Sequence, residues 1–192
     1  MAIGAMALLA CASRPAAAGL VSVGLAGGVS VPVDNVSDAF DNGVAGQGYV
    51  KFNIPFIIQP RVDFTFQDMD INDVSVVEPG FGPGAYTSGT QQIFSGLAHA
   101  QFNIITAGPV TPYIVAGVGW SNLDTSLEDA SGASTSKSTT QVTVDGGAGV
   151  LVKLGPVKAF LEGRLSNVVN DGELINFDSV QTVPVTIGVE LF

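Results

Sequence analysis

Histidine occurs once in this chain of 192 residues, as His99, and its side chain is the one best suited to carry protons near neutral pH. Together with a serine and a carboxylate, a histidine can form the catalytic centre of a hydrolase. His99 lies in a segment where polar and apolar residues alternate, on the polar side of that alternation. We interpret it as a histidine with polar partners inside the protein, and we predict no catalytic residues.

Two other motifs offer ligand-binding groups. Asp68, Asp70 and Asp73 carry the oxygen ligands that hard cations prefer, but their spacing differs from that of a calcium-binding loop. The glycines of the segment 145–149, Asp-Gly-Gly-Ala-Gly, lie within a strand pattern and not between a strand and a helix, where phosphate-binding glycines occur. We therefore predict solvated acids at the first motif, close backbone packing at the second, and no metal-binding or cofactor-binding residues.

The clearest structural pattern is a hairpin over residues 139–167. Every second residue from Val142 to Leu154 is uncharged, and the alternate set contains polar and charged residues. This period of two predicts a β-strand with two unlike faces. The pattern resumes after Gly155 and Pro156, which predicts two long antiparallel strands joined by a short turn.

Six further segments repeat the alternation. In all, we predict strands at about 20–31, 44–53, 58–67, 93–104, 111–121, 139–154, 157–166 and 182–191. Strands of roughly 9–11 residues are long enough to cross a bilayer when tilted. The chain therefore predicts an all-β fold, an eight-stranded antiparallel up-and-down transmembrane β-barrel.

The connections between these segments alternate between short and long. The short ones lie around Pro55, Gly108 and Gly155. The long ones are acidic and span 34–43, 68–89, 122–138 and 168–177. Barrels of the bacterial outer membrane have short periplasmic turns and long extracellular loops, so we predict that the four long connections are extracellular loops.

Composition excludes several classes of protein. The mean hydropathy is +0.42, yet no run of 18 apolar residues occurs, which argues against a membrane-spanning helix. The formal net charge is −10, and basic residues form no stripe, so nucleic acid is excluded as a partner. Residues 1–18 resemble a signal peptide and leave 19–192 as the barrel domain. Cys11, the one cysteine, lies in the apolar part of that signal, although a lipid-modified cysteine stays open.

The polar strand faces carry most of the basic residues. Their charged residues are Lys51, Arg61, Lys153, Lys158, Arg164, Asp63, Asp145, Glu162 and Glu190. Because an unpaired charge in hydrocarbon costs several kcal/mol, we predict that these side chains point into the barrel and form ion pairs. The alternative is a soluble, lipocalin-like ligand-binding barrel with the apolar face inside, but its outer face would require many more charged residues.

The chain resembles the OmpA-like family of small outer-membrane barrels. The resemblance rests on the opening segment 21–43 and on the closing strand VPVTIGVELF, which ends in the aromatic Phe192. Phe192 is out of phase with the apolar residues of that strand. The resemblance implies contact with outer-membrane lipids and lipopolysaccharide, and recognition by the barrel-insertion machinery through the strand that ends at Phe192.

The expected function is that of an integral protein of the bacterial outer membrane without enzymatic activity or cofactor. Its role is expected to be structural, adhesive or limited to the passage of small solutes, and the protein is expected to be monomeric. Two alternatives stay open from the sequence: a narrow porin-like channel for small or apolar solutes, and a lipid-modifying enzyme that uses His99.

Overall fold

The computed structural model describes eight ranges of the chain. They are residues 19–33, 37, 40–54, 57–71, 86–105, 108–129, 131–169 and 179–191. The predicted signal peptide at 1–18, with Cys11, and the C-terminal Phe192 lie outside these ranges.

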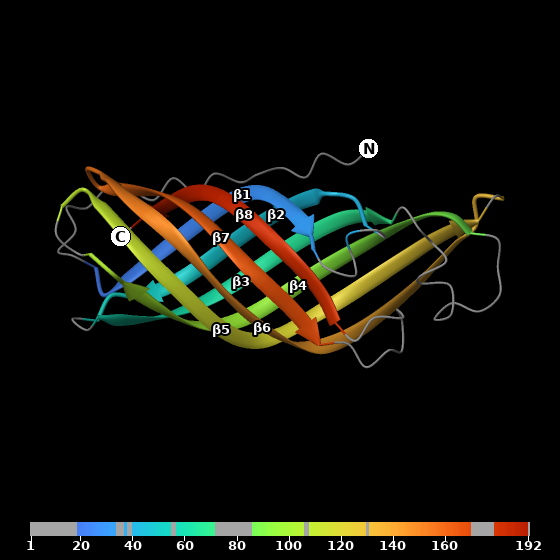
Figure 1. The fold of residues 1–192 in the computed structure, drawn as a ribbon, viewed down its shortest axis with the longest axis horizontal. Coiled ribbons are helices and arrows are strands. Elements are labelled where there is room, and N and C mark those ends of the chain that lie inside the picture. The colour runs from blue at the N-terminus through green and yellow to red at the C-terminus, as the bar shows by residue number, and fades with distance from the viewer. Residues whose placement is uncertain are drawn as a thin grey trace.

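Eight strands follow one another in the described residues (Figure 1). Their bounds are β1 Val21–Pro32, β2 Gly43–Phe52, β3 Ile58–Ile71, β4 Tyr86–Asn103, β5 Val110–Asp129, β6 Ser134–Leu154, β7 Val157–Val169 and β8 Ser179–Leu191. Each strand pairs antiparallel with its neighbours in the sequence, and β1 pairs with β8 to close the barrel. The predicted up-and-down, eight-stranded antiparallel barrel is confirmed. Among the described residues, no helix is long and apolar enough to cross a membrane.

The two faces of the strands are those that the alternation predicted. The apolar side chains point outward along the middle of the barrel, and Trp120, Leu161 and Ile187 are 68%, 54% and 68% exposed. The polar side chains point inward and are buried, including Lys51, which is 1% exposed. A soluble lipocalin-like barrel requires the opposite arrangement, so that alternative is wrong.

Two of the four predicted loops are much shorter than expected. In the range 122–138, β5 continues to Asp129 and β6 begins at Ser134, and the two strands stay paired up to Glu128 and Ser134. In the range 68–89, β3 continues to Ile71 and β4 begins at Tyr86. We refer to this part, residues 68–71 of β3, 86–92 of β4, 122–129 of β5 and 134–141 of β6, as the extension. Figure 1 shows β4, β5 and β6 reaching well beyond the ends of β1, β7 and β8.

The error has a physical cause, because the alternation continues in the extension with its two faces exchanged. On β5, Leu123 and Leu127 are buried inside the barrel, whereas Asp124 and Glu128 on the same strand are exposed. On β3, Met69 and Ile71 are likewise buried and Asp70 is exposed. Outside a bilayer the usual arrangement of a β-sheet returns, with apolar residues inside and polar residues in water.

The other two long connections agree better with the prediction. β7 continues only to Val169, inside the predicted 168–177 loop, and residues 170–178 lie outside the described ranges. In the predicted 34–43 loop, Phe40 forms an isolated bridge with Ile71 and is 2% exposed. Phe40 therefore adds an apolar side chain to the interior at the long-connection end.

Candidate functional site: the barrel interior

The centre of the barrel interior contains a network of charged side chains. Arg61 on β3 bonds to two carboxylates, with its Nη2 2.6 Å from Asp63 Oδ1 and its Nη1 2.7 Å from Glu162 Oε2. Its guanidinium also lies 3.9 Å from the centre of the Tyr49 ring. An arginine can hold two carboxylates and an aromatic face at once because its charge is spread over a planar fork of donors.

His99 belongs to the same network. Its Nδ1 lies 2.6 Å from Asp63 Oδ2, and its Nε2 lies 2.5 Å from Asp145 Oδ1. Both ring nitrogens therefore face carboxylate oxygens, and the contact of Nε2 with Asp145 has the geometry of a hydrogen bond. Arg164 Nη1 adds a cation 3.2 Å from Asp145 Oδ2.

The network contains basic and acidic side chains in equal numbers. Its basic members are Arg61, Arg164 and His99, and its acidic members are Asp63, Asp145 and Glu162. All six side chains are buried. Removing charges from water is costly unless each one is paired, so the arginines and carboxylates of a closed interior have to meet. The sequence-based prediction that the inward charges form ion pairs is confirmed for these residues.

The chemistry open to His99 is limited by these contacts. Both ring nitrogens face carboxylates, and Nε2 also lies 3.4 Å from Arg164 Nη1. The described serine hydroxyls nearest in sequence bond elsewhere, with Ser95 Oγ 2.6 Å from Ser121 Oγ. Catalysis by a general base needs a free nitrogen lone pair and a nucleophile beside it, whereas Nε2 of His99 lies within hydrogen-bond distance of Asp145 Oδ1.

A layer of aromatic and aliphatic side chains packs beside the charged network. It consists of Tyr49, Tyr113, Leu151 and Phe160, with Ala26 against it. The Tyr113 hydroxyl donates to Glu162 Oε2 at 2.7 Å, and the Tyr49 hydroxyl donates to Glu190 Oε2 at 2.8 Å. The two tyrosines therefore connect the central network to a second ionic group at the short-turn end.

Glycines on the inward face make room for these large side chains. A Cβ at Gly24 would lie 2.2 Å from the Tyr49 ring, and a Cβ at Gly117 would lie 2.2 Å from the His99 ring. Both distances are shorter than any van der Waals contact between carbon atoms. The abundance of glycine in the inward-facing positions is thus a consequence of how tightly the interior is filled.

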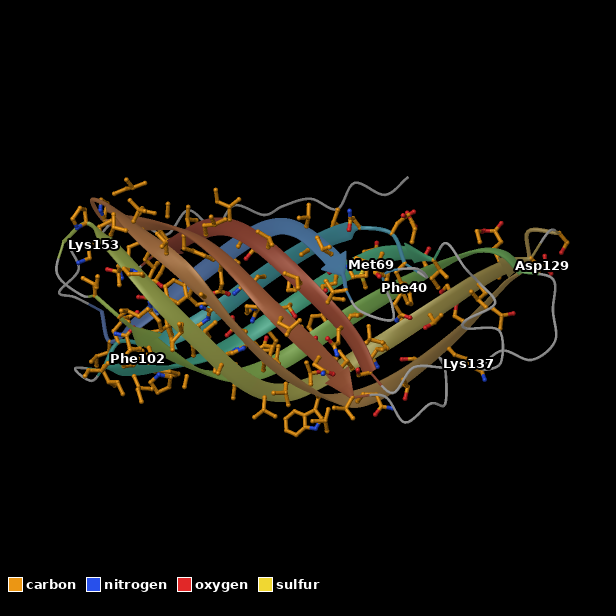
Figure 2. All side chains as sticks on the ribbon, in the orientation of Figure 1. Phe40, Met69, Phe102, Asp129, Lys137 and Lys153 are labelled. Atoms are coloured by element: carbon orange, nitrogen blue, oxygen red, sulfur yellow. The ribbon has the colours of Figure 1, made fainter. Side chains whose placement is uncertain are left out.

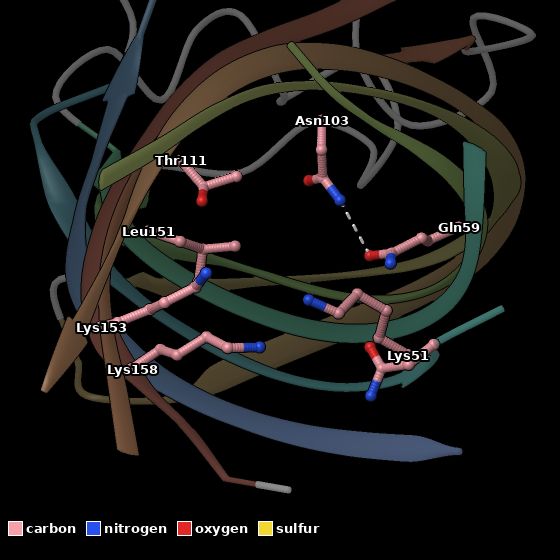
Figure 3. Close-up of a pocket in the computed structure, with 8 residues that line it drawn as sticks. Lys51, Gln59, Asn103, Thr111, Leu151, Lys153 and Lys158 are labelled. Atoms are coloured by element: carbon pink, nitrogen blue, oxygen red, sulfur yellow. Dashed lines mark hydrogen bonds between the residues drawn. The ribbon is translucent and has the colours of Figure 1, made fainter. Parts of the chain in front are cut away.

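The second ionic group lies at the short-turn end and surrounds Glu190. Lys51 Nζ is 2.5 Å from Glu190 Oε2, and Lys158 Nζ is 2.7 Å from Glu190 Oε1. A cavity of about 120 Å³ opens beside this group. It is lined by Lys51, Asn53, Gln59, Asn103, Thr111, Leu151, Lys153 and Lys158 (Figure 3).

The structure also places the two other motifs considered in the sequence, for which we predicted no metal-binding or cofactor-binding residues. Asp68 and Asp70 lie on the outward face of β3, and Asp73 is outside the described ranges. In the part of the chain that the structure describes, no group of three or more potential metal ligands occurs. The segment 145–149 lies within β6, as its strand pattern predicted.

Two features of the interior were missed from the sequence. The buried apolar residues of the extension were assigned to loops, although their own alternation, with apolar residues at 69, 71, 123 and 127, is a detectable signal. Lys153 was expected to point inward and form an ion pair. It is exposed at the short-turn end, and none of the described acidic residues forms an ion pair with it.

Similar proteins share this architecture. Residues 3–190 match the family described as outer membrane protein beta-barrel domain. Neisserial surface protein A is similar in structure, with a TM-score of 0.63 and 17% identity over 90% of this chain and 97% of that one. Ail, the attachment invasion locus protein of Yersinia pestis, solved with the heparin analogue sucrose octasulfate, has a TM-score of 0.51 and 15% identity over 89% of this chain and 96% of that one.

A third similar structure is a major outer membrane protein from Thermus thermophilus, with a TM-score of 0.57 and 11% identity over 89% of this chain and 98% of that one. At such low identities the likeness shows the fold alone. No curated protein matches the chain. The match over residues 3–190 nevertheless shows that the chain belongs to the outer membrane protein beta-barrel domain family, and the protein is an integral β-barrel of the bacterial outer membrane.

Proposed function

We propose that this protein is a non-conducting, non-enzymatic barrel that holds the extension outside the cell as an adhesive surface. The observation that carries the proposal is the β5–β6 hairpin, which stays paired up to Glu128 and Ser134. β6 pairs with β7 from Thr143 onward, so the hairpin continues beyond the closed wall through residues 134–142 of β6. A lipid-embedded barrel needs no such projection to be stable.

The filled interior supports a closed barrel. The central ionic network, the tyrosine layer and the inward-facing apolar side chains of the extension all occupy the interior. An eight-stranded barrel is just wide enough for its interior to be filled by side chains. Passage of small solutes was one of the roles expected from the sequence. It requires that this packing opens.

The polar face of the extension supports a role in adhesion. Its outward side chains form hydrogen bonds across the strands, as between Ser126 Oγ and Ser136 Oγ at 2.8 Å and from Ser138 Oγ to Asn122 Oδ1 at 3.1 Å. These contacts order a hydroxyl-rich and amide-rich surface without covering it. Ordered polar groups of this kind reduce the entropy lost when a partner binds.

The charge of the extension suggests the chemistry of its partner. Its described charged residues are Asp68, Asp70, Asp124, Glu128, Asp129 and Lys137. Ail was solved with a sulfated, anionic heparin analogue. The acidic extension of this chain favours a different class of partner, a basic or neutral surface segment, because like charges repel during encounter.

Contacts with the envelope complete the proposal. The outward apolar band contacts outer-membrane lipids, with lipopolysaccharide at the end that carries the extension. The barrel-insertion machinery recognises the closing strand, and the folded protein is a monomer. The closed β1–β8 pairing supports a monomer because it leaves no strand edge unpaired within the closed wall.

Adhesion of cells that display the protein tests the main proposal. Cells carrying the full chain are expected to bind surfaces coated with a basic protein, and deletion of residues 124–138 should abolish that binding while the barrel still folds. Asp124→Asn combined with Glu128→Gln keeps the hairpin and removes two of the charges proposed to attract a basic partner, so this variant should bind more weakly than the full chain and more strongly than the deletion variant. Equal adhesion of the deletion variant and the full chain contradicts the adhesive role.

Conductance in planar bilayers tests closure. The wild-type barrel is expected to show no steady open state, because its interior is filled. A steady ohmic current from the wild type supports the alternative of a narrow porin-like channel. Lipid hydrolysis that is lost in His99→Ala but kept in Gln101→Ala supports the enzymatic alternative instead.

A further inference from the structure

Three lysines and one glutamate meet at the short-turn end of the barrel. Glu190 uses both carboxylate oxygens, one for Lys51 and one for Lys158. Lys153 is the residue directly opposite Lys158 in the β6–β7 pairing. The group formed by these four residues, which we call the lysine mouth, therefore carries two more positive than negative charges.

This excess of positive charge is unusual in two respects. Like charges directly opposite each other on neighbouring strands destabilise a sheet, so the placement of Lys153 and Lys158 has a cost. The chain as a whole carries a formal net charge of −10, and the extension at the other end is acidic. Figure 2 shows Lys153 at the end of the molecule opposite Asp129 and Lys137.

The lysine mouth opens onto the 120 Å³ cavity. Figure 3 shows the side chains of Lys51, Lys153 and Lys158 extending into the same space from β2, β6 and β7. Lys51 is only 1% exposed, so its ammonium group is held in the wall and not free in solvent. A cavity of this size accommodates several water-sized groups, which is sufficient for a tetrahedral oxyanion.

The cavity wall formed by β3 and β4, which faces Lys153 and Lys158, presents amide groups (Figure 3). Asn103 Nδ2 donates to Gln59 Oε1 at 3.1 Å, and Gln101 Nε2 donates to Asn103 Oδ1 at 2.8 Å. The amide oxygens of Gln59 and Asn103 thus accept hydrogen bonds within this wall, and none of the described residues accepts a hydrogen bond from the Gln59 amide nitrogen. Amide groups of β3 and β4, with Lys51 of the neighbouring β2, therefore face Lys153 and Lys158 of β6 and β7 across the cavity (Figure 3), and together they form a site for an anion.

We propose that the lysine mouth binds a phosphate group. A tetrahedral phosphate presents oxygens in several directions and so can contact donors on both walls, which a planar carboxylate does less well. Small outer-membrane barrels place their short turns in the periplasm. The phosphate there is either a free periplasmic phosphate or the headgroup of a phospholipid in the inner leaflet, and the two sources share the same recognition chemistry.

The test uses the folded full-length barrel in micelles of an uncharged, phosphate-free detergent. Inorganic phosphate is added at constant ionic strength against sodium chloride, and the backbone amide signals of Lys153 and Thr111 are followed by NMR. We expect saturable shifts with phosphate. Lys153→Gln should weaken the binding at least about tenfold, the effect of losing one charge-assisted hydrogen bond. Lys153→Arg should retain it.

Lys137→Gln is the matched control, since it removes the same charge at the opposite end of the barrel. Lys153 is exposed, so its substitution leaves the packed interior unchanged and folding can be verified by heat-modifiability on gels. Equal phosphate binding by the Lys153→Gln and Lys137→Gln variants overturns the proposal. An equal response to chloride, or shifts that fail to saturate, also overturns it.

A second arm distinguishes the two sources of phosphate. The same amide signals are compared in phospholipid nanodiscs and in bilayers of a phosphate-free glycolipid. If a headgroup is the ligand, the shifts occur in phospholipid without added phosphate and are absent in Lys153→Gln. If free phosphate is the ligand, the amide signals shift in both bilayers only when phosphate is added. No response in either bilayer, with or without phosphate, contradicts both forms of the proposal.

Discussion

The lipid-embedded wall contains all eight strands, and the extension continues four of them, β3 to β6, but the two regions obey opposite rules. In the wall, Trp120 and Leu161 point outward, and the interior contains Arg61, Asp63 and Glu162. In the extension, Leu127 points inward and Asp124 outward. The backbone and its period of two are unchanged, and only the surroundings of the outer face differ. The surroundings of the outer face therefore decide which residues each face requires. Lipid surrounds the wall, and water surrounds the extension.

The largest expected effect concerns the ionic interior of the wall. Glu162→Ala removes one of the two carboxylates that bond to Arg61 and leaves the buried network one anion short. Breaking a buried ion pair costs on the order of 3–5 kcal/mol, so the free energy of unfolding should fall by that amount. Urea titration of the barrel in lipid vesicles measures the change.

Asp124→Ala is the control for this prediction, since it removes an exposed carboxylate of the extension. Its effect should stay within about 0.5 kcal/mol, as for other surface substitutions. If both variants unfold at the same urea concentration, the interior contains enough water to screen its charges.

The next largest effect concerns the outer face of the wall. Leu161→Arg places a charge against lipid and should destabilise the barrel by roughly 2–4 kcal/mol if the site lies near the midplane of the bilayer. Ser126→Arg makes the same addition to the outer face of the extension, where water solvates it, and should be nearly neutral. Folding yields of the two variants in vesicles test the assignment of the two regions. If the folding yield falls equally in both variants, the extension lies within the bilayer, which contradicts its assignment to water.

The inner face of the extension is expected to behave like the core of a soluble protein. Leu127→Ala removes a side chain that is 1% exposed and that lies close to Ile71 and to Gly89. The cost should be about 2 kcal/mol, the lower end of the range for buried leucines, because the site is near the end of the barrel. Hydrogen exchange should accelerate in the β5–β6 hairpin of the extension and not in the wall. Leu161→Ala, whose side chain faces lipid, should leave the exchange of the hairpin unchanged.

The smallest effect concerns the tip of the extension. The pKa of Asp129 is lowered because its carboxylate accepts a hydrogen bond from the Ser131 hydroxyl, and also from the backbone amides of Ala133 and Ser131. A carboxylate with a lowered pKa stabilises the folded state above its unfolded pKa of about 3.9, and that contribution is lost as the pH falls through the lower, folded value. The Ala133 amide should therefore exchange faster relative to the wall below about pH 4.

Asp129→Ala should remove this pH dependence of the tip while it leaves the wall unaffected. The ratio of the Ala133 exchange rate to that of a wall amide, measured in both proteins across the acid range, gives the comparison directly. If this ratio depends on pH equally in Asp129→Ala and in the wild type, a group other than Asp129 causes the pH dependence.

Much of the wall can be predicted from the sequence because its main signal is local. The alternation of apolar and polar residues in the segments near 58–67 and 157–166 identifies each strand and its lipid-facing side without knowledge of any partner. The burial of Arg61, Asp63 and Glu162 follows from the cost of charge in hydrocarbon. The extension has the same period of two. Its polar residues point outward into water, however, and in the sequence they resemble the polar residues of a loop.

The partners across the interior depend on the tertiary structure. Arg61 contacts Glu162, which is 101 residues away, and His99 lies between Asp63 and Asp145 of two other strands. Lys153 shares the inward phase of its strand, yet it ends at the exposed mouth beside Lys158. These contacts depend on strand tilt and on the stagger with which β1 meets β8, quantities set by closure of the whole barrel. A pattern within one strand determines which face a residue occupies, whereas closure determines which residues meet inside.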